Sequence, residues 1–244
     1  MRRFFAAPEN FSEKEIRLNE DESRHLRDVL RLRTDERVTV FDGDGNEFLC
    51  SIERIERKTV SLSILETTTA PSPESGLNLT LALALLKGEK FDLAVQKATE
   101  LGVKKIVPLE TERADVKIKD EKDSLKKLER WRRIALEAAK QSGRAFVPRV
   151  EKSIRFEDFV KTNSGDEGFF FAERGGDGLN QISNKDLEKL TVVVGSEGGW
   201  EDREIVLARS GNFKIVTLGG RILRAETAAI VAIALAQHLF GDLR

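Results

Sequence analysis

The sequence predicts an α/β protein in which a mainly parallel sheet follows a small β unit. Three observations predict this class. Residues 37–65 alternate apolar and polar side chains with period two, and residues 66–76, "ETTTAPSPESG", have a composition that neither helix nor strand tolerates. From residue 77 onward, short apolar runs alternate with helical stretches. Strands that alternate with helices are typical of a parallel sheet covered on both faces.

The first part of the chain reads as one short helix followed by antiparallel strands. Leu26, Val29 and Leu30 have helical spacing within "DESRHLRDVLRL", which leaves Arg24, Arg27 and Arg31 on another side. The turn "DGDGN" interrupts the alternating residues that follow. We therefore expect a small antiparallel β unit over residues 1–70, a linker over residues 71–76 and a second domain over residues 77–244.

Three helices of the second domain can be located from their apolar stripes. One stripe begins at Phe91 and ends before Gly102, and another runs through Trp131 and ends before Gly143. The last helix, "AETAAIVAIALAQHLF", is apolar nearly all round. Such a helix must be covered on every side, so it either runs through the middle of the domain or packs against a second copy of the chain.

Composition excludes several classes of protein. The chain has 244 residues, of which 40% are hydrophobic and 34% charged, as in ordinary soluble proteins. It shows neither a signal peptide nor an apolar run long enough to cross a membrane, which predicts a cytoplasmic protein. The single cysteine, Cys50, excludes an internal disulfide, and His25 and His238 lie far apart, so we expect no metal site.

The net charge of −1 hides an uneven distribution along the chain. Residues 113–155 contain fourteen Lys and Arg against seven acidic residues. This surplus could face the phosphates of a nucleic acid, or it could be a solvated helix face with ion pairs. The sequence leaves both interpretations open.

Two glycine-rich loops follow apolar strands near the C-terminus: "GSEGGW" after Val194 and "LGGRILRAE" after Thr217. Ligands of open α/β sheets bind beyond the carboxyl ends of the strands, although such loops are also ordinary tight turns. The first loop lacks the Gly-Lys-Ser/Thr ending of a phosphate-binding loop, and no GxGxxG follows the first strand of the domain. These absences favour a nucleoside ligand without a phosphate, a description that S-adenosyl-L-methionine fits.

The same residues carry a family resemblance. "VVVGSEGGWEDREIVLA" and "VTLGGRILRAETAAIVAIALAQ" resemble the RsmE family of SPOUT-class methyltransferases, which methylate N3 of a uridine in 16S ribosomal RNA. "KFDLAVQKATELGVKKIVPL", "RWRRIALEAAKQSGR" and "HLRDVLRLRTDERVTVFDGDG" are similar to other blocks of that family. Ser196 and Gly220 depart from it, because each stands where the family usually has proline.

The resemblance implies a fold that the patterns alone do not predict. It implies a SPOUT-type α/β domain whose mainly parallel sheet carries a trefoil knot, preceded by a small PUA-like β-barrel domain that binds RNA. It also implies a homodimer with S-adenosyl-L-methionine as cofactor and 16S rRNA as partner, free or within the small ribosomal subunit.

The resemblance further implies the residues of the site. The cofactor would be held mostly by main-chain groups of Phe171, Ala172, Val194, Gly195, Glu197, Gly198, Leu218, Gly219, Ile222 and Leu223. Gly199 is expected to serve the turn instead. Glu197 could hydrogen-bond the cofactor or order its own loop.

Methylation at N3 needs the uridine proton to leave, so a base must remove it or a cation must stabilise the resulting anion. Arg224 is the first candidate for the cation, Arg221 the second, and helix capping or phosphate binding is the alternative. Glu226 could be a general base, although a carboxylate in a first helical turn also has a structural role.

Arg2, Arg3, Arg24 and Arg31 are expected to hold RNA phosphates, and Phe4 or Phe5 could stack on a base or belong to the core. Two rival functions remain open. One is a noncatalytic RNA-binding or ribosome-assembly factor, and the other is an unrelated α/β enzyme that uses a phosphorylated nucleotide.

Overall fold

The structure, a computed structural model, describes residues 2–163, 167–179 and 187–243. It divides into two compact units, one of residues 1–74 with 139–147 and one of residues 75–138 with 148–244. The sequence assigns residues 139–147 to the second domain, whereas in the structure they belong to the first unit. The functions of the two domains stay predictions.

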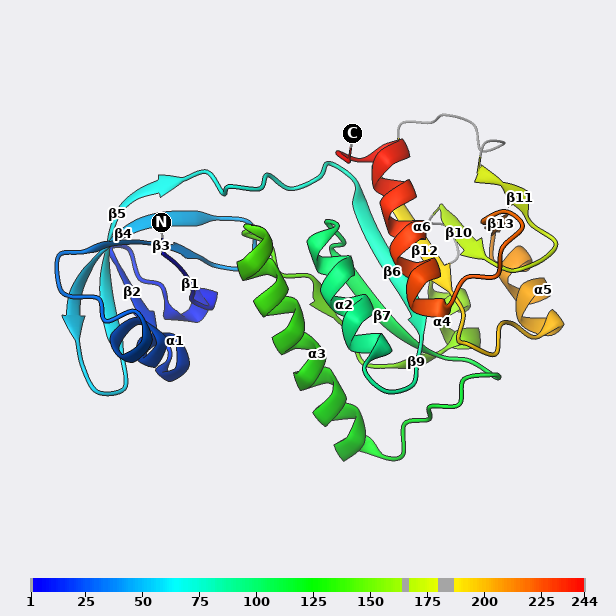
Figure 1. The fold of residues 1–244 in the computed structure, drawn as a ribbon, viewed down its shortest axis with the longest axis horizontal. Helices are drawn as coiled ribbons and strands as arrows, with labels where there is room; N and C mark the ends of the chain where they lie inside the picture. The colour runs from blue at the N-terminus through cyan, green and yellow to red at the C-terminus, as the bar shows by residue number, and fades with distance from the viewer. Residues whose placement is uncertain (1, 164–166, 180–186, 244) are drawn as a thin grey trace. The chain divides into compact units, whose positions relative to one another are not determined.

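The first unit is built on a five-stranded sheet in the order β1-β3-β4-β5-β2. Its strands are β1 (Arg3–Phe5), β2 (Glu15–Leu18), β3 (Arg37–Phe41), β4 (Glu47–Ile55) and β5 (Val60–Thr68). The pairs are antiparallel as expected, except that β1 pairs with β3 in parallel. The pairing of β4 with β5 shifts register twice, and such bulges bend strands, which explains why the sheet curls in Figure 1.

A single apolar core fills this curled sheet. The fully buried side chains include Phe4, Ile16, Leu26 and Ile52. Phe4 is therefore a core residue, which decides against base stacking for this ring. Burial raises the pKa of the Cys50 thiol to about 12, so this thiol is inert at neutral pH.

The helix predicted within residues 21–32 is confirmed only in part. Helix α1 (Glu20–Arg24) begins where the side chain of Asn19 accepts a hydrogen bond from the backbone N–H of Glu22. It continues as a single π-helical turn (His25–Val29), which ends the element earlier than the apolar spacing suggests.

The second unit contains an eight-stranded parallel sheet, confirming the α/β class. Seven strands follow the order β11-β13-β10-β12-β6-β7-β8, and β9 pairs with β7. The strands are β6 (Asn78–Ala84), β7 (Lys105–Glu110), β8 (Arg149–Val150), β9 (Ile154–Arg155), β10 (Gly168–Phe171), β11 (Asp177–Gly178), β12 (Lys189–Val194) and β13 (Phe213–Thr217).

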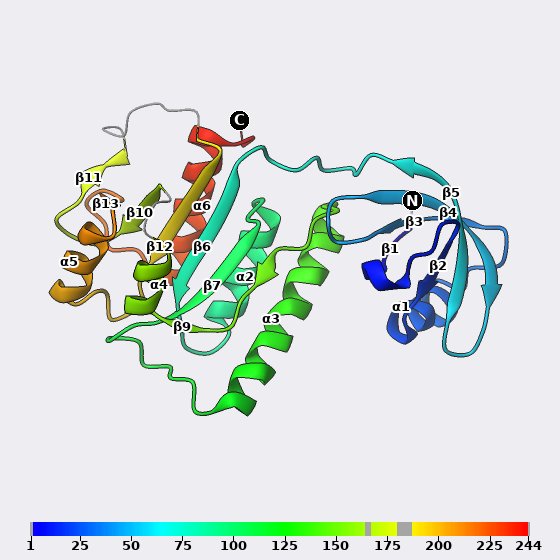
Figure 2. The same cartoon turned by 180° about the vertical axis from the view of Figure 1, so that it is seen from behind.

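Helices cover both faces of this sheet, so the central strands are buried on both sides. The helices are α2 (Lys90–Glu100), α3 (Glu121–Ser142), α4 (Phe156–Thr162), α5 (Asp202–Ser210) and α6 (Ala225–Phe240). Helix α6 packs on α2, β6 and β12, whereas α4 packs on α5 and β7. Figures 1 and 2, which differ by half a turn, show α2 and α6 on one face and α4 on the other.

Helix α6 buries only one of its faces within the chain. Glu226, Ala229, Ala232 and Ile233 are among its buried residues. Ile230, Val231, Ala234 and Leu235, on its other side, are only half-buried. The alternative in which this helix runs through the middle of the domain is therefore wrong.

The trefoil knot implied by the family resemblance concerns the threading of the chain, which strand order does not decide, and it stays a prediction. Within the described ranges, no helix is both long and apolar enough to cross a membrane. The same residues form no group of three or more metal-ligating side chains.

Candidate cofactor-binding site

A cavity of about 380 Å³ lies at the carboxyl ends of three neighbouring strands of the second unit. Phe171 of β10 is in register with Val194 of β12 and Val216 of β13, so the three strands end at the same level. The chain immediately after each strand lines the cavity. This volume falls in the range of about 300–1,000 Å³ typical of small-molecule sites.

The lining contains both glycine loops. It consists of Phe171, Ala172, Glu173, Val194, Gly195, Ser196, Glu197, Gly199, Trp200, Thr217, Leu218, Gly219, Gly220, Arg221, Ile222, Leu223, Arg224, Ala225 and Ala228. Two predicted site residues, Gly198 and Glu226, do not belong to it. The sheet therefore brings together the remaining candidates for cofactor binding and catalysis, from three segments of the chain, residues 171–173, 194–200 and 217–228.

The indole of Trp200 packs against the first glycine loop. Its indole N–H donates to the carbonyl of Phe171 at 2.9 Å, and its ring packs on Phe170 with centroids 4.3 Å apart. A Cβ atom at Gly195 would come within 2.9 Å of the indole ring, closer than real contacts allow. Glycine at position 195 thus lets the main chain lie directly against the indole.

The loop then turns back on itself. The N–H of Gly199 donates to the carbonyl of Ser196 at 3.0 Å, and Gly199 has a φ of +69°. Gly199 therefore serves the turn as expected, but it also lines the cavity. Gly198 faces elsewhere, since a Cβ there would lie 2.8 Å from the carbonyl oxygen of Arg113.

Glu197 is anchored from the opposite side of its loop. Its Oε1 accepts hydrogen bonds from Lys90 Nζ at 2.9 Å and from the backbone N–H of Lys87 at 3.4 Å. Burial raises the pKa of the Glu197 carboxyl, but the hydrogen bonds and the charge of Lys90 outweigh it, so the pKa lies below its ordinary value. An ionised, lysine-bound Glu197 orders its loop while it lines the cavity.

The second glycine loop presents charged and apolar side chains to the solvent side of the cavity. Ile222 is 81% exposed, and Arg221 and Arg224 are also exposed. Arg224 precedes the first residue of α6, but its side chain makes no capping hydrogen bond. Within the described part of the chain neither guanidinium has an ion-pair partner, which leaves both available to a ligand.

Glu226 is the catalytic candidate that lies apart from the cavity. It occupies the first turn of α6, is only 9% exposed and is absent from the lining. A carboxylate there complements the positive end of the helix. The structure therefore supports the structural interpretation of Glu226.

Sequence reasoning missed eight lining residues: Glu173, Ser196, Gly199, Trp200, Thr217, Gly220, Ala225 and Ala228. Glu173 and Thr217 could have been found, because they lie at the carboxyl ends of apolar strands, where ligands of parallel sheets bind. In the sequence, Ser196 stands out only as a departure from the family motif. No pattern in the sequence indicates that Trp200 folds back against Phe171.

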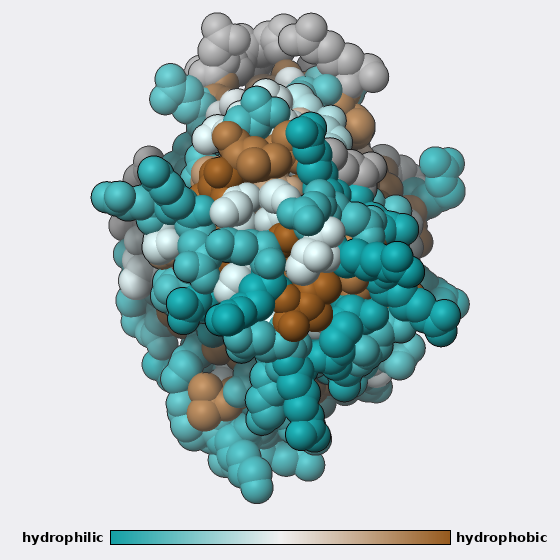
Figure 3. All heavy atoms as spheres, turned by 90° about the vertical axis from the view of Figure 1, so that its left-hand side faces the viewer, coloured by the Kyte–Doolittle hydropathy of each residue, from teal (hydrophilic) through white to brown (hydrophobic). Residues whose placement is uncertain are grey.

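The four arginines expected to bind RNA differ in exposure and in whether an acidic residue already pairs with them. Arg31 is exposed, has an unusual φ of +53° and has no partner among the described residues. Arg2 and Arg24 are exposed and each pairs with one acid at 3.3 Å, a contact that solvent weakens. Figure 3 shows a mainly hydrophilic surface with scattered apolar patches, which by itself singles out no RNA-binding face.

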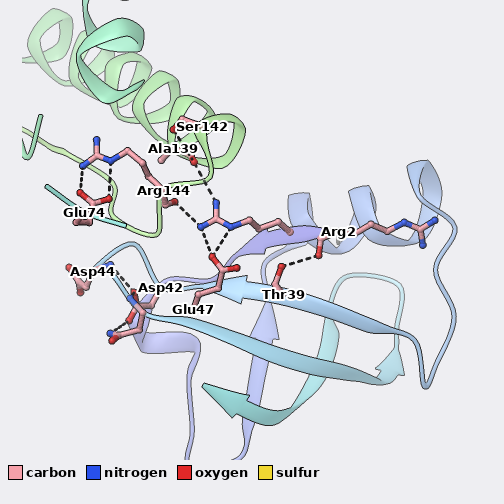
Figure 4. Close-up of polar contacts among 11 residues, drawn as sticks. Arg2, Thr39, Asp42, Asp44, Glu47, Glu74, Ala139, Ser142 and Arg144 are labelled. Carbon is pink, nitrogen blue, oxygen red and sulfur yellow. Dashed lines mark hydrogen bonds and ion pairs between the residues drawn. The ribbon is translucent and has the colours of Figure 1, made fainter. Parts of the chain in front are cut away.

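Arg3 has a structural role instead. Its side chain is only 11% exposed, and its guanidinium pairs with Glu47 at 2.6 Å and donates to the carbonyl of Arg144 at 2.8 Å. Figure 4 shows Glu47 and Arg144 among the polar contacts of this region. It also lies 4.1 Å above the ring of Phe41. We therefore correct the expectation that Arg3 holds a phosphate, because its donors are already used inside the first unit.

Seven of the fourteen cations in the basic stretch, residues 113–155, form ion pairs with described residues. The pairs are Arg113–Glu201, Lys127–Asp123, Arg130–Asp92, Lys140–Glu22, Arg144–Glu74, Lys152–Glu121 and Arg155–Asp158. These contacts favour the solvated face with ion pairs over a dedicated phosphate-binding surface.

Fold and cavity together define an α/β ligand-binding protein with a separate β unit. Comparisons with known proteins identify the family within this class. A family model described as RNA methyltransferase domain matches residues 73–237. A second, described as RNA methyltransferase PUA domain, matches residues 18–65.

Similar proteins identify the family. The ribosomal RNA small subunit methyltransferase E of Synechocystis is 38% identical over 239 residues, covering 95% of this chain and 76% of the relative, and that of Rickettsia conorii is 36% identical, covering 90% and 88%. The Neisseria gonorrhoeae enzyme of the same name, solved with S-adenosyl methionine, is 35% identical, with a TM-score of 0.89 and full coverage of both chains. A Legionella pneumophila methyltransferase solved with the same cofactor is 33% identical, with a TM-score of 0.88 and coverage of 99% and 98%. The chain belongs to the ribosomal RNA small subunit methyltransferase E family.

Proposed function

We propose that this chain methylates N3 of a specific uridine in 16S ribosomal RNA, with S-adenosyl-L-methionine as methyl donor. The observation that carries the proposal is the cavity at the ends of β10, β12 and β13, closed by two glycine loops that resemble those of the family. Family membership and two related structures solved with this cofactor support it. The protein would act in the cytoplasm, on free rRNA or on the small ribosomal subunit.

The residues of the cavity fit the cofactor. Both glycine loops line the cavity, and their main-chain N–H and C=O groups can hydrogen-bond a neutral nucleoside. The floor of the cavity is apolar, as the faces of a nucleoside require. The lining contains no lysine that could hold a terminal phosphate, which disfavours a phosphorylated nucleotide.

When bound, the cofactor supplies a methyl group made electrophilic by its sulfonium. The glycine loops would hold it through main-chain groups, and Gly219, where a Cβ would meet nothing within 4 Å, leaves the backbone open to a ligand. Phe171, Ala172, Leu218 and Leu223 would pack against it and exclude water. The remaining task of the protein is to align the uridine with the methyl group and to manage the N3 proton.

Arg224 would carry out the chemical part of this task, with Arg221 as the second candidate. Loss of the N3 proton leaves negative charge on the uracil ring, mainly on the carbonyl oxygens beside N3. A guanidinium placed against one of these oxygens stabilises the anion, and removing such a group costs about 3 kcal/mol of transition-state stabilisation. Both arginines lie at the cavity, exposed, with no ion pair in the described structure.

We also propose a homodimer that uses the open side of α6. Ile230, Val231, Ala234 and Leu235 form a half-buried apolar face on this helix, and Leu239 is 39% exposed. A second copy of the chain would cover this face in a two-fold symmetric interface.

The test of the function is incubation of the purified protein with radiolabelled S-adenosyl-L-methionine and unmodified 16S rRNA or small subunits. We expect label in the rRNA and a reverse-transcription stop at one uridine, because an N3 methyl group blocks the pairing edge. RNA binding without label would contradict catalysis and would indicate an RNA-binding or assembly factor.

A further inference from the structure

A second cavity, of about 720 Å³, lies beside the cofactor site at the same edge of the parallel sheet. Leu85 and Leu86, directly after β6, line it, and so does Val116 of the loop that follows β7. Strands β12, β6 and β7 are parallel neighbours, so their carboxyl ends meet at this edge. Because neighbouring strands are about 4.8 Å apart, β6 and β7 end only roughly 5–10 Å from β12, whose end belongs to the cofactor cavity.

One short loop separates the two cavities. Leu86 and Gly88 line the second cavity, whereas Lys87, between them, donates its backbone N–H to Glu197 of the cofactor cavity at 3.4 Å. Lys90 Nζ reaches the same carboxylate at 2.9 Å. A polymer that enters the cofactor cavity at this edge can therefore continue directly into the second cavity.

The floor of the second cavity is apolar and includes an unused donor. The rings of Phe91 and Trp131 pack 4.4 Å apart, and both side chains line the cavity. The indole N–H of Trp131 has no hydrogen-bond partner among the described residues, yet it is not one of their buried unpartnered atoms, so it remains accessible. At Gly88 a Cβ atom would meet nothing within 4 Å, which leaves the backbone open as well. Such a floor suits a nucleobase, whose nitrogens and carbonyl oxygens can accept from the indole.

The rim of this cavity keeps a positive charge after its ion pairs are counted. Four of its charged side chains neutralise one another in two pairs, Arg130–Asp92 and Lys127–Asp123. The other charged residues of the lining, Lys126, Glu129 and Arg133, are exposed and form no ion pair within the described ranges. Two cations therefore remain against one acid. Lys126 and Arg133 are seven positions apart, so they project from the same face of α3.

These two cations differ from the rest of the basic stretch, where ion pairs argue against phosphate binding along its whole length. They flank an open cavity with an apolar floor and a free indole donor. An apolar peptide would leave all three donors without acceptors. A nucleotide supplies a phosphate for the cations and base acceptors for the indole.

We propose that this cavity binds a nucleotide of the RNA substrate next to the target uridine. The base lies on the floor of Phe91 and Trp131, and Lys126 and Arg133 contact a backbone phosphate. The inference rests on the proposed function, because it assumes that an RNA strand delivers its uridine to the cofactor cavity. The family resemblance places RNA binding in the first unit, and this site adds a contact in the second.

The test measures RNA binding by the full chain with Lys126→Gln and Arg133→Gln combined. Filter binding of unmodified 16S rRNA without cofactor should show affinity lowered about 5- to 30-fold, the effect of two exposed charge contacts. Each phosphate contact to a single strand adds about 0.7 to the slope of log affinity against log salt concentration, so the slope should become shallower by about 1.4. In methyl transfer, KM for the rRNA should rise by the same factor, while kcat and the affinity for S-adenosyl-L-methionine stay unchanged.

Trp131→Phe tests the contact with the base, because phenylalanine keeps an aromatic ring in the floor and removes the N–H donor. Affinity for the rRNA should fall about 3- to 10-fold with an unchanged salt slope. Unchanged affinity in a variant that melts as the wild type does would overturn the base contact. If this variant does not fold, the exposed cation variant decides alone.

Lys161→Gln combined with Arg149→Gln is the matched control. It removes the same charge from exposed residues of the second unit outside both cavity linings, and it should bind the rRNA as the wild type does. An equal loss of affinity in this control would reduce the effect to net charge and overturn the inference. Unchanged affinity and slope in the Lys126 and Arg133 variant would overturn it too, as would a lowered affinity for S-adenosyl-L-methionine. A wild type that binds the rRNA through this cavity but transfers no methyl group would contradict the proposed function alone.

Discussion

Arg221 and Arg224 are three positions apart in one loop, yet the chemistry proposed for them needs only one well-placed guanidinium. Arg224 directly precedes α6, so the rigid helix start limits where its side chain can reach. Arg221 follows two glycines, one with a φ of +85°, and its backbone is less constrained. Because the start of α6 fixes the position of Arg224 more precisely, we expect Arg224 rather than Arg221 to contact the uracil ring.

Arg224→Ala should therefore lower the rate of methyl transfer about a hundredfold, while affinity for S-adenosyl-L-methionine changes less than about threefold. Single-turnover transfer and calorimetric titration measure the two effects. Arg203→Ala removes an exposed arginine of α5 that pairs with Glu112, and it should leave both unchanged. An equal loss of affinity and rate in Arg224→Ala would assign this residue to cofactor binding instead.

Glu197 allows a prediction about pH. Because its pKa in the folded protein lies below the ordinary value of 4.5, its contribution to stability is complete above pH 4.5 and is lost as the pH falls through the lowered value. The difference in melting temperature between the wild type and Glu197→Gln should be constant from about pH 5 to pH 8 and should shrink at more acidic pH. Lys90→Met removes the main hydrogen-bond donor and should reduce this difference. A difference that grows on acidification would contradict the assignment.

At the level of elements, the cavity depends on the two glycine loops and on the strands that precede them. The first loop is held by the indole of Trp200 on one side and by Lys90 acting through Glu197 on the other. The second loop runs from the end of β13 to the start of α6, and among the described residues no comparable side-chain hydrogen bond holds it. We therefore expect the first loop to be the more rigid part of the cofactor site.

Gly195→Ala should destabilise the protein by about 1–3 kcal/mol, because the added methyl group would overlap the Trp200 indole. The displaced indole should also weaken cofactor binding. Chemical denaturation and titration with S-adenosyl-L-methionine measure these effects. Gly76→Ala is the control, since a Cβ there meets nothing within 4 Å, and its stability should equal or slightly exceed that of the wild type. Full stability of Gly195→Ala would show that the loop can move away from the indole.

At the scale of the whole molecule, the half-buried apolar face of α6 is the reason to expect a dimer. A helix that is apolar on both sides but buried on only one leaves a surface that water does not favour. The wild-type protein should sediment as a dimer, with twice the mass of the 27.4 kDa chain.

Val231→Glu should shift the protein to monomers, because it places a charge in the middle of the proposed interface. Val206→Glu introduces the same charge at a 67% exposed position on α5 and should remain dimeric. Analytical ultracentrifugation at micromolar concentration distinguishes these outcomes. A monomeric wild type would refute the proposed dimer, and cofactor titration of Val231→Glu would show whether the site itself needs the partner.

The local patterns of the sequence predict much of this architecture. Period-two alternation indicates the curled β unit, apolar runs between helical stripes indicate the parallel sheet, and glycine loops after Val194 and Thr217 indicate where a ligand binds. These predictions succeed because the repeat of side chains along a strand or helix is set by local geometry, and because parallel strands align their carboxyl ends.

Only the tertiary structure decided how individual side chains are used. Arg3 and Arg31 look alike in the sequence, but Arg3 is occupied by Glu47 and by the carbonyl of Arg144, which is 141 positions away. Three other features also depend on distant parts of the chain. The Ser196 and Thr217 hydroxyls are buried, Gly198 does not line the cavity, and residues 139–147 belong to the first unit. Local periodicity specifies which face of an element is buried, whereas the partner of a polar group is determined only when the elements pack together.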